Sequence, residues 1–180
     1  MAAKTSVFYL TERLELTTSG AIVTDTIDLG AYVDVADRQG ILIHDVDFVF
    51  QGTNSAGVIQ PLDATFTTNG TMFAQLTDLN RAALVFADDR ALVASGQLLL
   101  DQSQNIVSSE ADLYPDNFGP TSAQGGRIVI NDQMYFNGAL NGTLGANEAV
   151  HVTARIKCSV ISLSQKDFMA IALQSTAADN

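Results

Sequence analysis

The sequence contains few side chains whose chemistry could support catalysis or tight metal binding. It has two histidines, His44 and His151, and a single cysteine, Cys158. Two imidazoles cannot build a zinc or iron site that relies mainly on histidine, and one thiol excludes a multi-cysteine metal site and an internal disulfide. No Gly-x-Ser-x-Gly motif is present, and Asp45 would point to the opposite face of a strand from its neighbour His44. We therefore expect no enzyme activity and no cofactor.

Acidic side chains are the remaining candidates for binding chemistry. Asp45 and Asp47 share one face of a predicted strand with their Cα atoms roughly 6.5 to 7 Å apart, close enough for one cation to bridge them or for an acid–base pair. Asp112 and Asp116 offer oxygen ligands in a loop, although their spacing does not match an EF-hand. Solvated surface positions are the commoner role of such residues. The metal candidates are Asp45, Asp47, Asp112 and Asp116.

A long alternation of apolar and polar residues over 149–161 is the clearest predicted element. It predicts a strand of roughly 40 Å, because a strand rises ~3.3 Å per residue. Its apolar face, from Val150 to Val160, includes Cys158, which we expect to be a buried thiol rather than a nucleophile. His151 falls on the polar face, where exposure is the default. His44 interrupts an apolar strand face, so we expect it to be partly buried and hydrogen-bonded.

Shorter strand patterns recur through the rest of the chain. Asn69 and Gly70 lie between the strand-favouring runs 62–68 and 71–77, and an Asn-Gly pair is the strongest short-range hairpin signal. In total we count eight or nine strands and expect one all-β domain over residues 1–180, since 180 residues fit one compact domain better than two. The other strands are predicted at 6–16, 21–29, 41–50, 92–100 and 127–136.

Helix is sparse in the sequence. Asp78 can cap a short helix in which apolar residues recur at three- and four-residue spacing up to Phe86. Residues 165–174 fit either a helix, because Ser164 and Asp167 have capping-box spacing, or a buried strand, because 168–173 is apolar on both faces. We favour the strand there, which leaves one short helix.

Charge and hydropathy limit the classes of partner. Nine Lys and Arg against twenty Asp and Glu give a net charge of -11, which opposes docking on phosphate backbones. We therefore expect no direct nucleic-acid partner. Hydrophobic residues make up 47% and charged residues only 16%, so we expect apolar surface to be covered by a partner. The loop around 112–120 has turn chemistry and aromatics, and it supplies the subunit-contact candidates Tyr114, Asp116 and Phe118.

Targeting signals are absent from the pattern of the sequence. Nowhere do about eighteen apolar residues run together, and residues 1–5 lack the apolar run of a signal peptide. We expect a chain that is synthesised in the cytosol and does not span a membrane.

In size and strand pattern, the whole chain resembles the small single jelly-roll major capsid proteins of icosahedral, membrane-containing viruses of archaea and bacteria. In that family two four-stranded sheets pack face to face, and the subunits tile as oligomers, often with a second related jelly-roll chain. The resemblance implies a virion shell subunit, made in the host cytoplasm, whose partners are copies of itself, a related capsid chain and an underlying viral membrane. The alternative is a β-sandwich ligand-binding module of the lectin or adhesin type, which the absence of Trp and the presence of only four Tyr disfavour.

Overall fold

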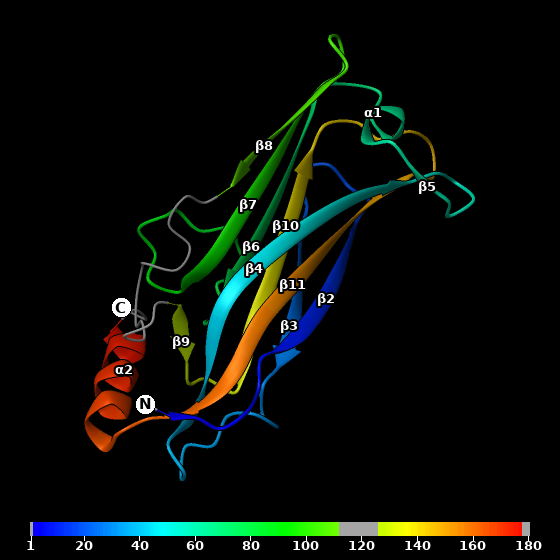
Figure 1. Cartoon of the computed structure of the whole chain (residues 1–180). Coiled ribbons are helices and arrows are strands. Elements are labelled where there is room, and N and C mark those ends of the chain that lie inside the picture. Colours follow the sequence, from blue (N-terminus) through cyan, green and yellow to red (C-terminus); the bar gives the residue numbers. More distant parts are fainter. Residues whose placement is uncertain (1, 112–125, 178–180) are drawn as a thin grey trace.

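Two antiparallel sheets packed face to face form the body of the computed structural model, which describes residues 2–111 and 126–177 (Figure 1). Within these residues, sheet A contains β1 (Ala2–Ala3), β2 (Phe8–Leu16), β4 (Gln39–Thr53), β5 (Ile59–Gln60), β9 (Arg127–Val129) and β11 (Ala149–Ser162). Sheet B contains β3 (Ile22–Asp28), β6 (Gly70–Thr77), β7 (Leu92–Asp101), β8 (Ile106–Ala111) and β10 (Gln133–Asn141). The described helices are α1 (Leu62–Thr65) and α2 (Gln165–Ala177).

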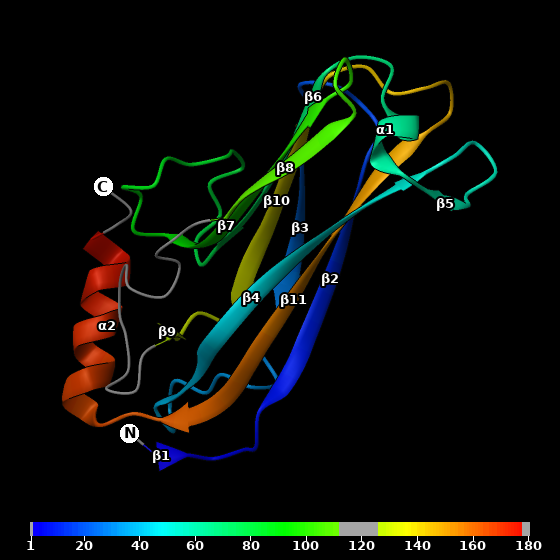
Figure 2. The same cartoon turned by 45° about the horizontal axis from the view of Figure 1, so that its top comes forward.

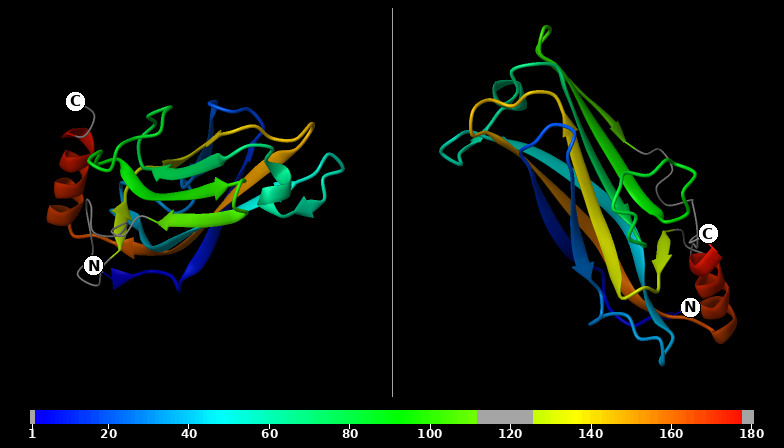
Figure 3. Two further views of the ribbon diagram at one scale, coloured as in Figure 1. Left: turned by 90° about the horizontal axis from the view of Figure 1, so that it is seen from above. Right: turned by 180° about the vertical axis from the view of Figure 1, so that it is seen from behind.

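The strand order is that of a jelly roll. Sheet A runs β2-β11-β4-β9 and sheet B runs β3-β10-β6-β7, so the chain moves repeatedly from one sheet to the other. Figure 2 shows β2, β11 and β4 side by side, and Figure 3 shows the two layers from above. Eight strands in two such sheets make a jelly roll, to which β1, β5 and β8 are added. The predicted all-β jelly-roll class is confirmed.

The core lies between the sheets and is centred on β11. The alternating side chains from Val150 to Val160 are buried, and those up to Cys158 join Met72, Leu76 and Phe136 of sheet B in one cluster. The long strand predicted at 149–161 is therefore confirmed, together with the face that it buries. A second, smaller cluster lies under α2 and contains Leu42, Ile128, Ile130, Ile161, Leu163, Phe168 and Ile171.

The strand predicted at 165–174 is wrong, because this segment forms α2. Ser164 begins the helix: its Oγ accepts a hydrogen bond from the backbone N–H of Asp167 at 3.2 Å and donates one to the Asp167 carboxylate at 2.8 Å. Phe168 and Ile171 then turn toward the second cluster. Because the cap satisfies a backbone donor, the helix wins over the strand. In the described part of the chain, α2 and α1 are both too short to cross a bilayer as apolar helices.

Three other local predictions are also wrong. Residues 62–65 form α1 instead of a strand, and Phe66 bridges to Leu144, so Asn69 and Gly70 do not join a hairpin of 62–68 with β6. The helix predicted from Asp78 is an irregular connection between β6 and β7. The strand predicted at 127–136 is two strands, since the chain crosses from sheet A to sheet B between β9 and β10.

Candidate subunit-contact surface

The predicted acidic pair lies on the outer face of sheet A. Asp45 and Asp47 are both exposed, and the register of β4 and β11 places Lys157 opposite Asp45 and Arg155 opposite Asp47. The Asp47 carboxylate and the Arg155 guanidinium are 3.5 Å apart. The fold thus brings the two carboxylates to one face and surrounds them with cations. Among the residues that the structure describes, no three His, Cys, Asp or Glu side chains gather as a metal site would require.

The other predicted site residues fall outside the described part of the chain. These are the metal candidates Asp112 and Asp116 and the contact candidates Tyr114, Asp116 and Phe118. Their roles stay predictions.

The histidines and the cysteine occupy structural positions. His44 is half-buried, with its Nε2 atom 2.9 Å from Ser159 Oγ, as the interrupted apolar face predicts. His151 is also half-buried rather than exposed, and its Nε2 atom lies 3.3 Å from Thr53 Oγ1. Cys158 is fully buried, and this burial raises the pKa of its thiol to about 11. A protonated, enclosed thiol cannot act as a nucleophile at neutral pH.

The outer faces of the two sheets differ sharply in charge. The outer face of sheet A carries both signs across neighbouring strands, from Arg13, Glu15, Asp45, Asp47, Arg155 and Lys157. Over β3, β10, β6 and β7, the described residues at the centre of the outer face of sheet B are uncharged, while the register of the edge strand β8 places Glu110 next to Gln97. Three of its cross-strand rows contain Thr24, Asn137, Gln75 and Ser95, then Ile22, Ala139, Phe73 and Gln97, then Asn141, Thr71 and Leu99. Protein interfaces are depleted of charge at their centres, so sheet B presents the face suited to a partner.

Two acids protect one side of the sandwich against strand addition. β2 and β3 are edge strands, and the register places Glu12 opposite Ala154 and Asp25 opposite Phe136, on the core-facing side of each sheet. An inward-pointing charge on an edge strand makes pairing with another chain costly, because pairing would enclose the carboxylate. The edges at β2 and β3 are therefore poor sites for pairing with a strand of another chain.

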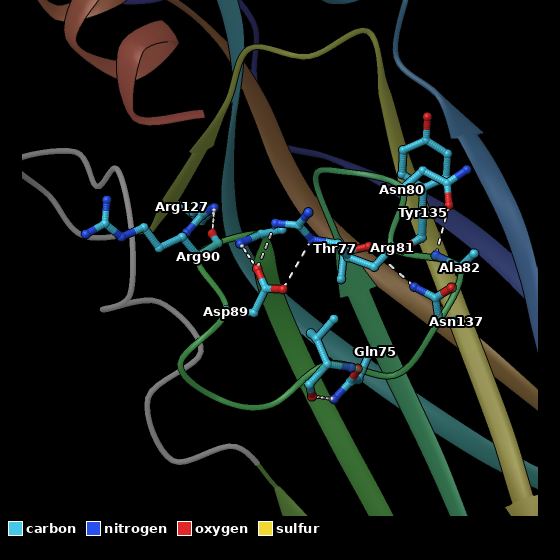
Figure 4. Close-up of polar contacts among 12 residues, drawn as sticks. Gln75, Thr77, Asn80, Arg81, Ala82, Asp89, Arg90, Arg127, Tyr135 and Asn137 are labelled. Carbon is cyan, nitrogen blue, oxygen red and sulfur yellow. Dashed lines mark hydrogen bonds and ion pairs between the residues drawn. The ribbon is translucent and has the colours of Figure 1, made fainter. Parts of the chain in front are cut away.

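The connection between β6 and β7, residues 78–91, lies over one end of the outer face of sheet B (Figures 1 and 4). Gln75 on that face holds it with two hydrogen bonds: its Nε2 donates to the carbonyl oxygen of Val85 at 2.8 Å, and its Oε1 accepts from the Val85 N–H at 2.7 Å. Within this connection, Arg81 and Asp89 form an ion pair, with Arg81 Nε 3.2 Å from an oxygen of the Asp89 carboxylate. We call residues 78–91 the clamped loop.

A buried ion pair fixes the base of the clamped loop. Arg127, at the start of β9, donates from Nη2 to the Asp78 carboxylate at 2.8 Å and to the carbonyl oxygen of Arg90 at 2.7 Å. Asn131 donates to the Asp78 carbonyl oxygen at 2.7 Å, and the Asp78 N–H donates to the carbonyl oxygen of Ala91 at 2.9 Å. Burial raises the pKa of Asp78 above its usual value, while the nearby Arg127 opposes this effect. Both ends of the loop are therefore fixed to the sandwich.

Phe86 is the most exposed large apolar side chain in the described structure, at 85% of its full accessibility. It lies in the clamped loop between the half-buried Val85 and the exposed Ala87. Holding an aromatic ring in water offers no stability to the isolated chain, so this arrangement is typical of a contact residue. The sequence does not mark Phe86 as a contact residue, because its spacing from Ala83 and Leu79 predicts one face of a short helix. The Asn80 and Asp89 side chains, which bond to the N–H groups of Ala82 and Ala91 two residues on, are the turn signals that could have revealed it.

Comparison with known proteins finds likenesses among solved structures. No protein-family model matches the chain, and no curated protein matches it. VP1 of Trichodysplasia spinulosa-associated polyomavirus, solved in complex with GM1 oligosaccharide, is 10% identical with a TM-score of 0.35, over 91% of this chain and 97% of that chain. A structure of Desmodium yellow mottle tymovirus is 5% identical with a TM-score of 0.33, over 92% of this chain and 95% of that chain. At these TM-scores the likenesses carry no conclusion about function.

Proposed function

We propose that this chain is a structural virion protein, a capsid subunit that self-assembles into an icosahedral shell. The observation that carries the proposal is the uncharged outer face of sheet B with the exposed Phe86 fixed above it, on a jelly-roll frame. Jelly rolls are common in viral capsids, and their two-layer frame leaves the outer faces and loops free for neighbours. An uncharged face with an apolar loop is suited to contact between copies.

The charge distribution supports a shell that does not touch nucleic acid. The chain has a net charge of -11, and three of its nine Lys and Arg residues, Arg13, Arg155 and Lys157, are interspersed with acids on the outer face of sheet A. A surface of this kind cannot release the counterions that backbone binding requires. We therefore place the protein in the virion as an outer or membrane-backed layer, of the kind found in membrane-containing viruses. Its partners would be copies of itself, with or without a related capsid chain.

The alternative is a ligand-binding module of the lectin or adhesin type, which also occurs on jelly-roll frames. It predicts a discrete oligomer or monomer with a saturable ligand. Assembly predicts growing species whose size depends on protein concentration.

Sedimentation velocity across a salt series separates the two functions. Electrostatic repulsion between copies at a net charge of -11 is screened over about 10 Å at 0.1 M salt and over shorter distances above it. The assembly proposal therefore predicts that the mean sedimentation coefficient rises with salt and with protein concentration. A chain that stays monomeric at high concentration and high salt would overturn the proposal and favour the ligand-binding module.

A further inference from the structure

The outer face of sheet B contains a hollow at the end opposite to the clamped loop. It has a volume of about 580 Å3 and lies among the first residues of β6, the hairpin of β7 and β8, and the end of β10. Its apolar lining comes from Leu99, the buried Leu100 and Ile106, which is more than half exposed, and Ser108 also lines the hollow. Gly70 begins β6 at the hollow, and Thr77 ends β6 at the clamped loop. One face thus carries an exposed ring at one end and a partly apolar hollow at the other.

We propose that Phe86 of one copy sits in this hollow of a second copy, a contact that specifies which surface is used if the proposed assembly function holds. Two faces that pack in opposite directions bring each Phe86 to the hollow of the other copy. The contact is then self-complementary, as in a two-fold dimer.

The area of the face is sufficient for a stable contact. β6 has eight residues, so at ~3.4 Å per residue the face is roughly 27 Å long, and five strands at ~4.8 Å spacing make it roughly 24 Å wide. The clamped loop covers one end of this face, so the contact area consists of the loop and the uncovered rows, and the two copies together would bury at most about 1,300 Å2, at the lower end of the ~1,200–2,000 Å2 of stable protein interfaces. A small ligand in the hollow would leave most of this uncharged face in water, so a second copy is the occupant that fits.

The charges at the rim complement one another. Asp101 lies at the rim of the hollow, and hydrogen bonds from Ser103 lower the pKa of its carboxyl group, so it is ionised at neutral pH. The exposed Arg90 follows Phe86 by four residues on the clamped loop. Arg90 is therefore a cation on the same loop as Phe86, opposite in sign to the Asp101 carboxylate at the rim of the hollow. The exposed Asp88 adds a negative charge to the same loop, so the clamped loop carries both signs, and the expected tightening with salt rests on the net charge of -11 of each copy.

Cross-linking between two single-cysteine variants tests the contact directly. Ala87→Cys places a thiol beside Phe86, and Ser108→Cys places one in the hollow, both at exposed positions. The native Cys158 is fully buried and does not compete for the reagent. The matched control is Thr11→Cys, an exposed position on the outer face of sheet A. A short bismaleimide is added to mixtures of the variants at high salt, and sedimentation of the same samples reports assembly.

The proposal predicts a cross-linked dimer of Ala87→Cys with Ser108→Cys, and at least tenfold less product of Ala87→Cys with Thr11→Cys. Adding Phe86→Asp to the Ala87→Cys chain should remove the product at an unchanged melting temperature, because Phe86 is exposed. If the chain assembles but the two mixtures give equal yields, or Phe86→Asp has no effect, the contact is wrong and the proposed function stands. If nothing assembles at any salt concentration, both are wrong.

Discussion

Removing Arg127 should destabilise the protein far more than removing any surface cation. Arg127 is almost fully buried, and its Nη2 atom satisfies both the Asp78 carboxylate at 2.8 Å and the carbonyl oxygen of Arg90 at 2.7 Å. Arg127→Met keeps an unbranched side chain but leaves the buried carboxylate without its cation. Breaking a buried ion pair in this way costs about 3 to 5 kcal/mol. Because burial already raises the pKa of Asp78, protonation relieves part of the cost, and we expect about 3 kcal/mol.

The matched control is Arg155→Met on the outer face of sheet A. Arg155 and Asp47 are 3.5 Å apart, and their side chains are 54% and 58% exposed. An ion pair this exposed contributes about 0.5 kcal/mol or less. Urea unfolding of the wild type and both variants, followed by far-ultraviolet circular dichroism, gives the two losses in free energy of unfolding.

A second substitution tests the cause of the loss. Adding Asp78→Asn to Arg127→Met removes the unpaired charge, so the double variant should recover part of the stability that Arg127→Met loses. Equal losses for Arg127→Met and Arg155→Met would refute the assignment of Arg127 as the residue that fixes the clamped loop. An additive effect of the two substitutions at 78 and 127 would refute the coupling between them.

Three further predictions concern the core and the charge of the chain. Ile156→Asp places a charge on the fully buried face of β11 and should cost several kcal/mol, so an unchanged melting temperature would show that this face is not in the core. The pKa of the Cys158 thiol is about 11 in the folded chain against 9.0 for a free thiol, so the unfolded chain ionises first and the free energy of unfolding falls as pH rises through this range. In urea titrations at successive pH values, the free energy of unfolding of Cys158→Ala should fall less steeply with pH than that of the wild type. Equal slopes would show that ionisation of Cys158 is not the cause of the fall. Because its net charge is -11, the purified protein should not bind duplex DNA at physiological salt. Micromolar binding in an anisotropy titration would contradict this prediction.

Strict alternation made the central strand predictable. Burial in β11 alternates from Val150 to Cys158 because one side faces the core and the other faces solvent, so the sequence alone identifies its buried face, while Ser159 to Ile161 are buried on both sides. The same holds in part for β2, β3 and β7, whose positions match the predicted ranges within a few residues. The number and spacing of such strands predicted an all-β domain, and the resemblance to single jelly-roll capsid proteins supplied the jelly-roll class. The pairing order could not be read from them, because register depends on contacts between distant residues.

The segments that failed are those in which a tertiary contact decides between two local structures. Residues 168–173 are apolar on every side, so the choice between strand and helix rested on the Ser164 cap and on the cluster under α2. The clamped loop has helical spacing, yet Gln75 from a neighbouring strand binds its backbone at Val85 and holds it irregular. No spacing rule includes a side chain ten residues away. Phe86 as a contact residue was therefore visible only in the structure.

Electron microscopy of the purified chain after transfer to high salt tests the central claim most directly. The claim is that copies of this chain assemble through an uncharged sheet face and a clamped apolar loop. It predicts closed particles of uniform diameter for the wild type, and their loss in Phe86→Asp at an unchanged melting temperature. Fields of dispersed monomers for the wild type, or particles of the same size and number for Phe86→Asp, would contradict it.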